Sequence, residues 1–177
     1  MSGAALNGKR VKREKIEKLV KVLLGLGFSN VAIEHEICGS YRRGKKDSGD
    51  IDIVFIPKSI DDYNNWFDSL KVKKRKGKLA DNILIEDVQI DLFMATENSY
   101  AAMVMTWTGS RGFNIVMRGK LNRQGYVYTR HGIYDQLTGN IIENIKSEED
   151  IFDIAKINFV KPCDRWLFIN WIEYIFL

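Results

Sequence analysis

Cysteine is scarce in this sequence, and long apolar segments are missing. Cys38 and Cys163 lie far apart and match neither a zinc-binding spacing nor a disulfide framework. The longest aromatic-rich stretch, residues 166–177, is well short of the roughly 20 residues that a membrane-spanning helix needs. These absences exclude a disulfide-stapled domain and a transmembrane helix, and they predict reduced thiols in an intracellular protein with no membrane partner.

A signal peptide is not apparent either, because lysine and arginine are frequent among the first 24 residues. No internal repeat or low-complexity linker divides the chain. The 177 residues, 45% of them hydrophobic and 28% charged, fit one globular domain or two small lobes. The net charge of +4 suits a polyanionic partner, although many basic proteins bind nothing anionic.

Hydrophobic periodicity predicts a mixture of helices and strands. An apolar stripe predicts a first helix from about Lys9, ended by Gly25 and Gly27. Strands are predicted over 31–37, 51–56, 83–85 and 88–94, helices over 59–70, 101–120 and after 147, a polar loop over 39–44, and a hairpin whose turn is 137–140. The helices near 59 and 147 each begin with a Ser-x-x-Asp capping pair.

Three aspartates are the first candidates for chemistry. Asp50 and Asp52 are two positions apart in an extended segment, so their side chains point to the same face. Asp91 interrupts a later apolar strand, where an unpaired charge is costly to bury. If the two strands are neighbours, three carboxylates converge into an oxygen-rich site that suits two Mg²⁺ ions. For the Asp50–Asp52 pair alone, a solvated strand edge or turn is the more common arrangement.

A candidate phosphate cradle precedes these aspartates. Gly39 and Ser40 allow the backbone to approach a phosphate and offer a hydroxyl donor, and Arg43 can form a two-pronged contact with a phosphate. Gly49 lets the chain turn sharply into Asp50. Such a cradle beside a metal site is what triphosphate chemistry requires. An ordinary polar turn is the alternative.

Two segments resemble family X DNA polymerases, the polymerase beta group. Cys-Gly-Ser-Tyr-Arg-Arg-Gly at 38–44, followed by Asp-Ile-Asp at 50–52, is similar to the family's signature. Trp-Thr-Gly-Ser-Arg-Gly-Phe-Asn-Ile-Val-Met-Arg at 107–118 is similar to the nucleotide-binding part of its thumb, and 147–152 resembles its last helix. The resemblance implies an α+β fold, with a nucleotidyltransferase palm (a mixed sheet with helices on one face) over 1–102 and a small α/β thumb over 103–177.

The resemblance also implies an activity. The chain would be a monomeric DNA-directed DNA polymerase that uses two Mg²⁺ ions, replaceable by Mn²⁺, to add nucleotides from dNTPs to a primer 3′-hydroxyl. Primer–template or gapped DNA would be its partner, and gap filling in DNA repair its role. The family's lyase domain and fingers have no counterpart in the sequence, as in some short viral members, so no lyase activity is expected. The basic run at 71–78 is then a candidate for DNA phosphate contacts, with a solvated hairpin face as the slightly favoured alternative.

Residue roles follow from the same resemblance. Asp50, Asp52 and Asp91 would bind the metal ions and carry catalysis, and Arg10 is a further candidate for the triphosphate. The implied nucleotide-binding residues are Gly39, Ser40, Arg43 and Gly49 at the phosphates; Thr106, Trp107, Gly109 and Ser110 in the thumb segment, with the 106–109 stretch against the sugar; and Asn114 and Arg118 near the incoming base and the template minor groove.

Three departures from the family pattern modify these expectations. Gln89 stands two residues before the third aspartate, where the family usually has an arginine that damps the carboxylate charge. Thr106-Trp107 replaces the Tyr-Phe of beta-like members, in which the tyrosine helps to exclude a ribose 2′-hydroxyl, so weak discrimination against ribonucleotides is expected. Only Glu86-Asp87 joins the strands before Asp91, where template-free members insert a long loop. The turn must be tight, and template-directed extension at short gaps is expected.

Two other functions remain open on the sequence. One is a nucleotidyltransferase that modifies an RNA end, a protein or a small molecule, and the thumb segment argues against it. The other is a catalytically silent DNA-binding module, and the presence of all three aspartates argues against that.

Overall fold

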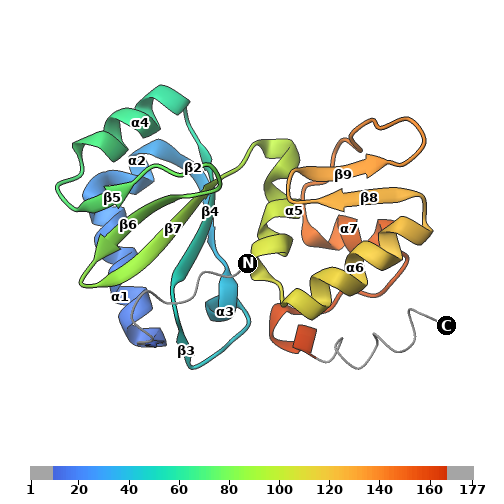
Figure 1. Cartoon of the computed structure of the whole chain (residues 1–177), viewed down its shortest axis with the longest axis horizontal. Coiled ribbons are helices and arrows are strands. Elements are labelled where there is room, and N and C mark those ends of the chain that lie inside the picture. Colours follow the sequence, from blue (N-terminus) through green and yellow to red (C-terminus); the bar gives the residue numbers. More distant parts are fainter. Residues whose placement is uncertain (1–9, 167–177) are drawn as a thin grey trace. The chain divides into compact units, whose positions relative to one another are not determined.

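The computed structural model describes residues 10–166, which form two compact units that divide between Met94 and Ala95 (Figure 1). The expected boundary after residue 102 falls within helix α5 (Glu97–Thr108), which belongs to the second unit. Among the described helices, none is long and apolar enough to cross a membrane. All but the first residue of the aromatic tail, 166–177, lies outside the described residues.

The first unit is built on a five-stranded sheet. Its strands, in spatial order, are β2 (Ala32–Ile37), β4 (Ile51–Pro57), β7 (Val88–Met94), β6 (Asp81–Ile85) and β5 (Lys73–Arg75). The β4 and β7 strands are parallel and the other neighbours antiparallel, so the sheet is mixed, as predicted. The tight turn between β6 and β7 is also confirmed, because Glu86 and Asp87 both have positive φ, 48° and 61°, as a two-residue hairpin turn requires.

Helices α1 (Arg13–Leu23), α2 (Ser29–Val31) and α4 (Ile60–Ser69) pack on one face of this sheet (Figure 1). Phe55 of β4 lies at the centre of the packing, with its ring 5.2 Å from that of Phe28 and 4.9 Å from that of Tyr63. Ile51 and Ile53 of the same strand are buried in this core. Because side chains alternate along a strand, Asp52 points to the opposite face, away from the helices.

The N-terminal helix differs from its prediction at both ends. Residues 11–12 form a short strand, β1 (Val11–Lys12), which pairs with β3 (Asp47–Ser48). At the other end the chain continues as a π-helical turn, η1 (Leu24–Phe28), and departs from helical geometry only at Gly27, where φ is 95°. Gly25 does not end the helix, since a glycine inside a helix costs only about 1 kcal/mol.

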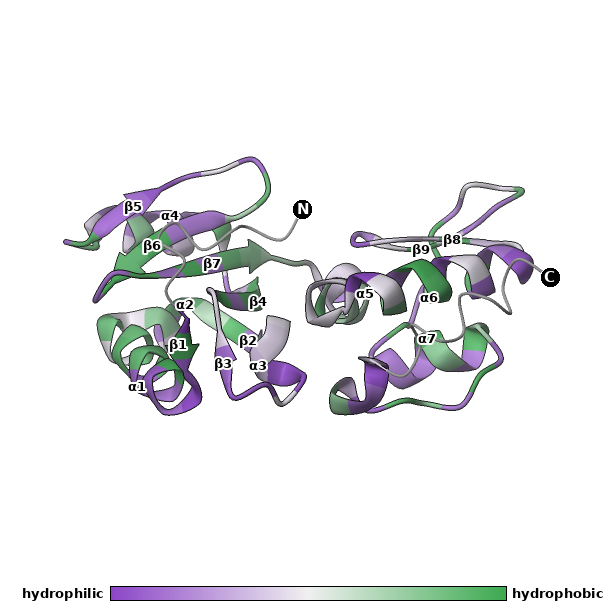
Figure 2. Ribbon diagram, turned by 60° about the horizontal axis from the view of Figure 1, so that its bottom comes forward, coloured by the Kyte–Doolittle hydropathy of each residue, from purple (hydrophilic) through white to green (hydrophobic). Residues whose placement is uncertain are grey.

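Two polar segments contain regular secondary structure. The polar loop over 39–44 begins with a helical turn, α3 (Gly39–Arg42). The basic run over 71–78 contains the edge strand β5, which Figure 2 colours as hydrophilic beside the more apolar β6 and β7. Lys74 Nζ donates to the carbonyl oxygens of Asp68 and Leu70 at the end of α4, and Lys76 pairs with the Asp68 carboxylate at 3.2 Å. Part of the basic run therefore stabilises the fold itself.

The second unit contains α5, α6 (Arg111–Arg123), the hairpin of β8 (Tyr126–Thr129) and β9 (Gly132–Asp135), and α7 (Glu148–Ile154). The single helix predicted over 101–120 is wrong: Gly109, with φ of 65°, ends α5, and the Ser110 hydroxyl accepts a hydrogen bond from the Phe113 N–H to start α6. The hairpin turn lies at 130–131, and 137–140 forms a second turn around the Asp135 carboxylate.

The core of the second unit holds a buried ion pair. The fully buried Arg165 donates to the Glu148 carboxylate at 2.8 Å. Its guanidinium lies 4.6 Å from the centre of the Phe113 ring and 5.7 Å from that of Phe152. At the start of α7 the predicted capping pair of Ser147 and Asp150 is confirmed in both directions.

Candidate active site

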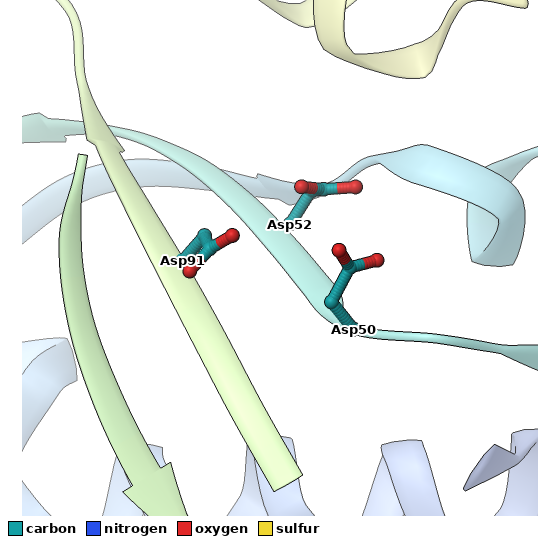
Figure 3. A group of neighbouring side chains, drawn as sticks. All are labelled: Asp50, Asp52 and Asp91. Carbon is teal, nitrogen blue, oxygen red and sulfur yellow. The ribbon is translucent and has the colours of Figure 1, made fainter. Parts of the chain in front are cut away.

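The structure brings Asp50, Asp52 and Asp91 together on the face of the sheet that the helices do not cover. The parallel register of β4 and β7 sets Asp52 directly opposite Asp91, and Asp50 immediately precedes β4. One carboxylate oxygen from each residue lies within 4.8 Å of the others. Figure 3 shows the three side chains directed into the same space. A cluster of three carboxylates at this spacing is a suitable ligand set for hard divalent cations such as Mg²⁺.

Burial and mutual repulsion disfavour the ionised forms of these carboxylates. Burial, followed by the neighbouring charges of Asp50 and Asp91, raises the pKa of Asp52 to about 8, although Arg43 lowers it in part. Burial and the Asp91 charge also raise the pKa of Asp50, an effect that Arg10 opposes. A bound cation would remove this penalty by favouring the ionised forms.

Asp91 is held by two amide side chains. Gln89 Nε2 donates to Asp91 Oδ1 at 2.7 Å, and Asn82 Nδ2 donates to the same oxygen at 2.5 Å. Burial raises the pKa of Asp91, whereas these two hydrogen bonds and the charge of Arg75 lower it. Sequence reasoning missed Asn82, yet the signal was available: counting back from the two-residue turn at 86–87 pairs position 82 with position 91.

The predicted phosphate cradle lies beside Asp52. Gly39 has a φ of 61°, and a Cβ atom added there would overlap Asp52 Oδ2, so only glycine allows this approach. The Cys38 N–H donates to the Asp52 carbonyl at 2.8 Å, which ties the start of α3 to the metal strand. Ser40 Oγ donates to Ser48 Oγ at 2.7 Å. Ser48, which is buried, is a further site residue that the sequence pattern did not single out.

The remaining predicted residues of the cradle follow α3 in the sequence. Arg43 follows the last residue of α3, and Gly49 lies between β3 and Asp50. Arg10 forms an ion pair with Asp47 and also donates to its carbonyl at 2.8 Å. Arg13 donates to the Tyr41 carbonyl at 2.9 Å, with its guanidinium 3.8 Å from the centre of the Tyr41 ring. The N-terminal segment thus fixes the cradle in place from both sides.

The predicted residues of the second unit form a group at the end of α5 and along α6. Trp107 lies near the end of α5, followed by Gly109 and Ser110 at the break before α6, while Asn114 and Arg118 lie one turn apart on α6. Asn114 Nδ2 donates to the Thr106 carbonyl at 2.8 Å. The Thr106 hydroxyl is 2.7 Å from the Tyr128 hydroxyl, and the Arg118 guanidinium lies 5.6 Å from the centre of that ring. Tyr128 of β8 therefore joins the group, although nothing in its local sequence indicated this.

The Asn114 side chain also has unused hydrogen-bonding capacity. Its Nδ2 must face the Thr106 carbonyl, because a carbonyl cannot donate, and this fixes the position of Oδ1. Oδ1 is buried and accepts no hydrogen bond from the part of the chain that the structure describes. A buried acceptor of this kind is normally satisfied by a partner, which a bound ligand can supply.

Comparisons with known proteins agree with this architecture. Family models of the DNA polymerase beta palm and thumb match residues 10–110 and 103–166. DNA nucleotidylexotransferase of Xenopus laevis is 23% identical over 208 residues, covering 88% of this chain and 40% of that protein. DNA polymerase lambda of Rattus norvegicus is 21% identical over 188 residues, covering 88% of this chain and 32% of that protein. The chain thus spans two-fifths or less of the length of these relatives.

A solved structure shares the fold. The crystal structure of Leishmania infantum polymerase beta, a ternary P/T complex, superposes with a TM-score of 0.73 at 19% sequence identity, covering 89% of this chain and 77% of that chain. The palm model alone matches more than half of the sequence, and the thumb model follows it in the expected order. The chain therefore belongs to the polymerase beta family, family X, and contains a palm followed by a thumb.

Proposed function

We propose that this protein is a DNA-directed DNA polymerase that adds nucleotides from dNTPs to a primer 3′-hydroxyl, filling short gaps during DNA repair. The observation that carries the proposal is the cluster of three carboxylates. Asp52 lies on β4, Asp91 on β7 and Asp50 just before β4, and one oxygen of each lies within 4.8 Å of the others. In the reaction the primer 3′-oxygen forms a bond to the α-phosphorus of the dNTP, and pyrophosphate leaves.

Different residues of the first unit would bind the metal ions and the phosphates. Asp50, Asp52 and Asp91 would hold two Mg²⁺ ions, or Mn²⁺ in their place, which when bound neutralise charge on the attacking and leaving oxygens. The Gly39 and Gly49 backbones, Ser40 and Arg43 would bind the β and γ phosphates. Donation by Arg43 and by backbone N–H groups suits the phosphate oxygens.

The second unit would position the sugar and the base. The residues that would contact the sugar are Thr106, Trp107, Gly109 and Ser110. Those that would face the base and the template are Asn114 and Arg118. The buried Asn114 Oδ1, which needs a donor, supports this role, because an N–H of the nucleotide can supply one.

The short β6–β7 turn gives the first prediction. We expect the protein to extend a primer across a short gap much faster than it extends a bare single strand, because the chain has only Glu86 and Asp87 where template-free relatives carry a long loop. Primer extension on gapped, nicked and single-stranded DNA with all four dNTPs measures this. Efficient extension of the bare strand would contradict template dependence.

The same assay separates the alternative functions. DNA binding without extension would favour a silent DNA-binding module. A failure to bind DNA, combined with turnover of nucleoside triphosphates, would favour transfer to another acceptor, such as an RNA end, a protein or a small molecule.

Sugar selection gives the second prediction. We expect a preference for dNTPs over rNTPs of less than about 100-fold in kcat/KM, since Thr106 offers less bulk than tyrosine and steric differences of this size discriminate by roughly 10–200-fold. Thr106→Tyr should raise the preference by about tenfold. Thr138→Tyr, the same exchange in an exposed turn of the second unit, should not change it. Strong rejection of ribonucleotides by the wild type would contradict this hypothesis.

A further inference from the structure

One row of side chains crosses four strands of the sheet and ends at the aspartates. The registers pair Arg75 of β5 with Asn82 of β6, Asn82 with Asp91 of β7, and Asp91 with Asp52 of β4. Directly paired residues lie on the same face of a sheet. Figure 1 shows the four strands as neighbours in this order. The row therefore connects the Arg75 guanidinium, at the exposed edge of the sheet, to Asp91 and Asp52 of the candidate site.

Hydrogen bonds run along this row in one direction. An Arg75 Nη atom donates to Asn82 Oδ1 at 3.1 Å, and Asn82 Nδ2 donates to Asp91 Oδ1 at 2.5 Å. A guanidinium has no acceptor and a carboxylate has no donor, so the Asn82 amide can satisfy both neighbours in only one orientation. Arg75 thus fixes the donor end of Asn82 toward the aspartate.

Gln89 completes the arrangement from within β7. It donates to the same Oδ1 atom that Asn82 uses, at 2.7 Å. Two donors on Oδ1 restrain the rotation of the Asp91 carboxylate, which would favour Oδ2 as the oxygen offered to a metal ion. Residues that hydrogen-bond a metal ligand orient it in this way, and their loss typically costs 10–100-fold in metal affinity or activity.

We infer that Asn82 and Arg75 are positioning residues for Asp91, and that they supply from the neighbouring strands what an arginine at position 89 would supply from β7 itself. This inference rests on the proposed function, because it assigns Asp91 to a divalent metal. It predicts that Asn82 contributes more to metal binding than Arg75 does. Asn82 contacts the Asp91 carboxylate directly, whereas Arg75 is exposed and acts through the Asn82 amide.

Binding of Mn²⁺ to the whole chain, followed by the electron paramagnetic resonance signal of the free ion, tests the inference without turnover. We expect Asn82→Ala to weaken Mn²⁺ binding at least about tenfold and Arg75→Met to weaken it by a smaller factor, with Arg75→Lys close to the wild type. Lys73→Met is the matched control, because it removes the same charge from the same strand and face, and its Mn²⁺ affinity should stay near that of the wild type.

Primer extension on the same variants provides the second readout. A positioning role predicts that kcat falls while the KM for dNTP stays within about twofold, whereas a general loss of folding would lower the melting temperature. Mn²⁺ affinities of Asn82→Ala and Arg75→Met equal to that of Lys73→Met would overturn the inference. If the wild type binds Mn²⁺ but extends no primer, the proposed function fails, and the order of the Mn²⁺ affinities still decides the role of the row.

Discussion

Asp91→Asn should lower the rate of primer extension by at least about 10³-fold, which corresponds to a loss of about 4 kcal/mol of transition-state stabilisation. The exchange keeps the size of the side chain and an oxygen that can accept from Asn82 and Gln89. It removes the negative charge that would hold a divalent cation between β4 and β7. Single-turnover extension of a one-nucleotide gap measures the chemical step.

The matched control for this prediction lies just before the same strand. Asp87→Asn is the same exchange in the exposed β6–β7 turn, where asparagine tolerates the positive φ of 61°. This variant should extend primers at the wild-type rate. If Asp91→Asn retained more than a tenth of the wild-type rate, Asp91 could not be a ligand for the catalytic metal.

Asp52→Asn should stabilise the metal-free protein, by an amount that grows between about pH 4 and pH 8. Burial and the neighbouring aspartates raise the pKa of Asp52 to about 8 in the folded state, against about 3.9 in an unfolded chain. Between these values the folded protein binds more protons than the unfolded chain, so the free energy of unfolding of the wild type falls as the pH rises. For one titrating group, the free energy of unfolding changes by at most about 1.4 kcal/mol per pH unit.

Urea unfolding of both proteins in a chelating buffer at pH 5, 6.5 and 8 measures this difference. Addition of Mg²⁺ at pH 8 should stabilise the wild type and largely remove the advantage of Asp52→Asn, because a ligand that binds only the folded state raises the free energy of unfolding. A difference between the two proteins that stayed constant with pH would show that Asp52 is not buried against its neighbours as described.

The sequence pattern was sufficient to predict the face of the sheet on which the aspartates lie. Apolar residues at 51, 53, 90 and 92 alternate with Asp52 and Asp91, so burying the former against helices directs the latter to the other side. The tight turn at 86–87 also determined the pairing of β6 with β7. Both inferences needed only local spacing, which the strand period and the turn length fix.

Contacts between distant segments could not be predicted in the same way. The register that sets Asp52 opposite Asp91 depends on how two strands separated by a helix and a hairpin pack in three dimensions. The contact of Thr106 with Tyr128 depends on such packing as well. The break before α6 is a different case: Ser110 was a readable helix start, but the helical period continued across it and concealed it.

The buried pair of Arg165 and Glu148 limits how far the chain can be shortened for laboratory work. A truncation that removes Arg165 would leave the Glu148 carboxylate buried without its cation, a change that typically costs roughly 3–5 kcal/mol. Small domains have total stabilities of about 5–15 kcal/mol. Helix α7 ends at Ile154, yet an expressible minimal thumb must extend far enough to include Arg165.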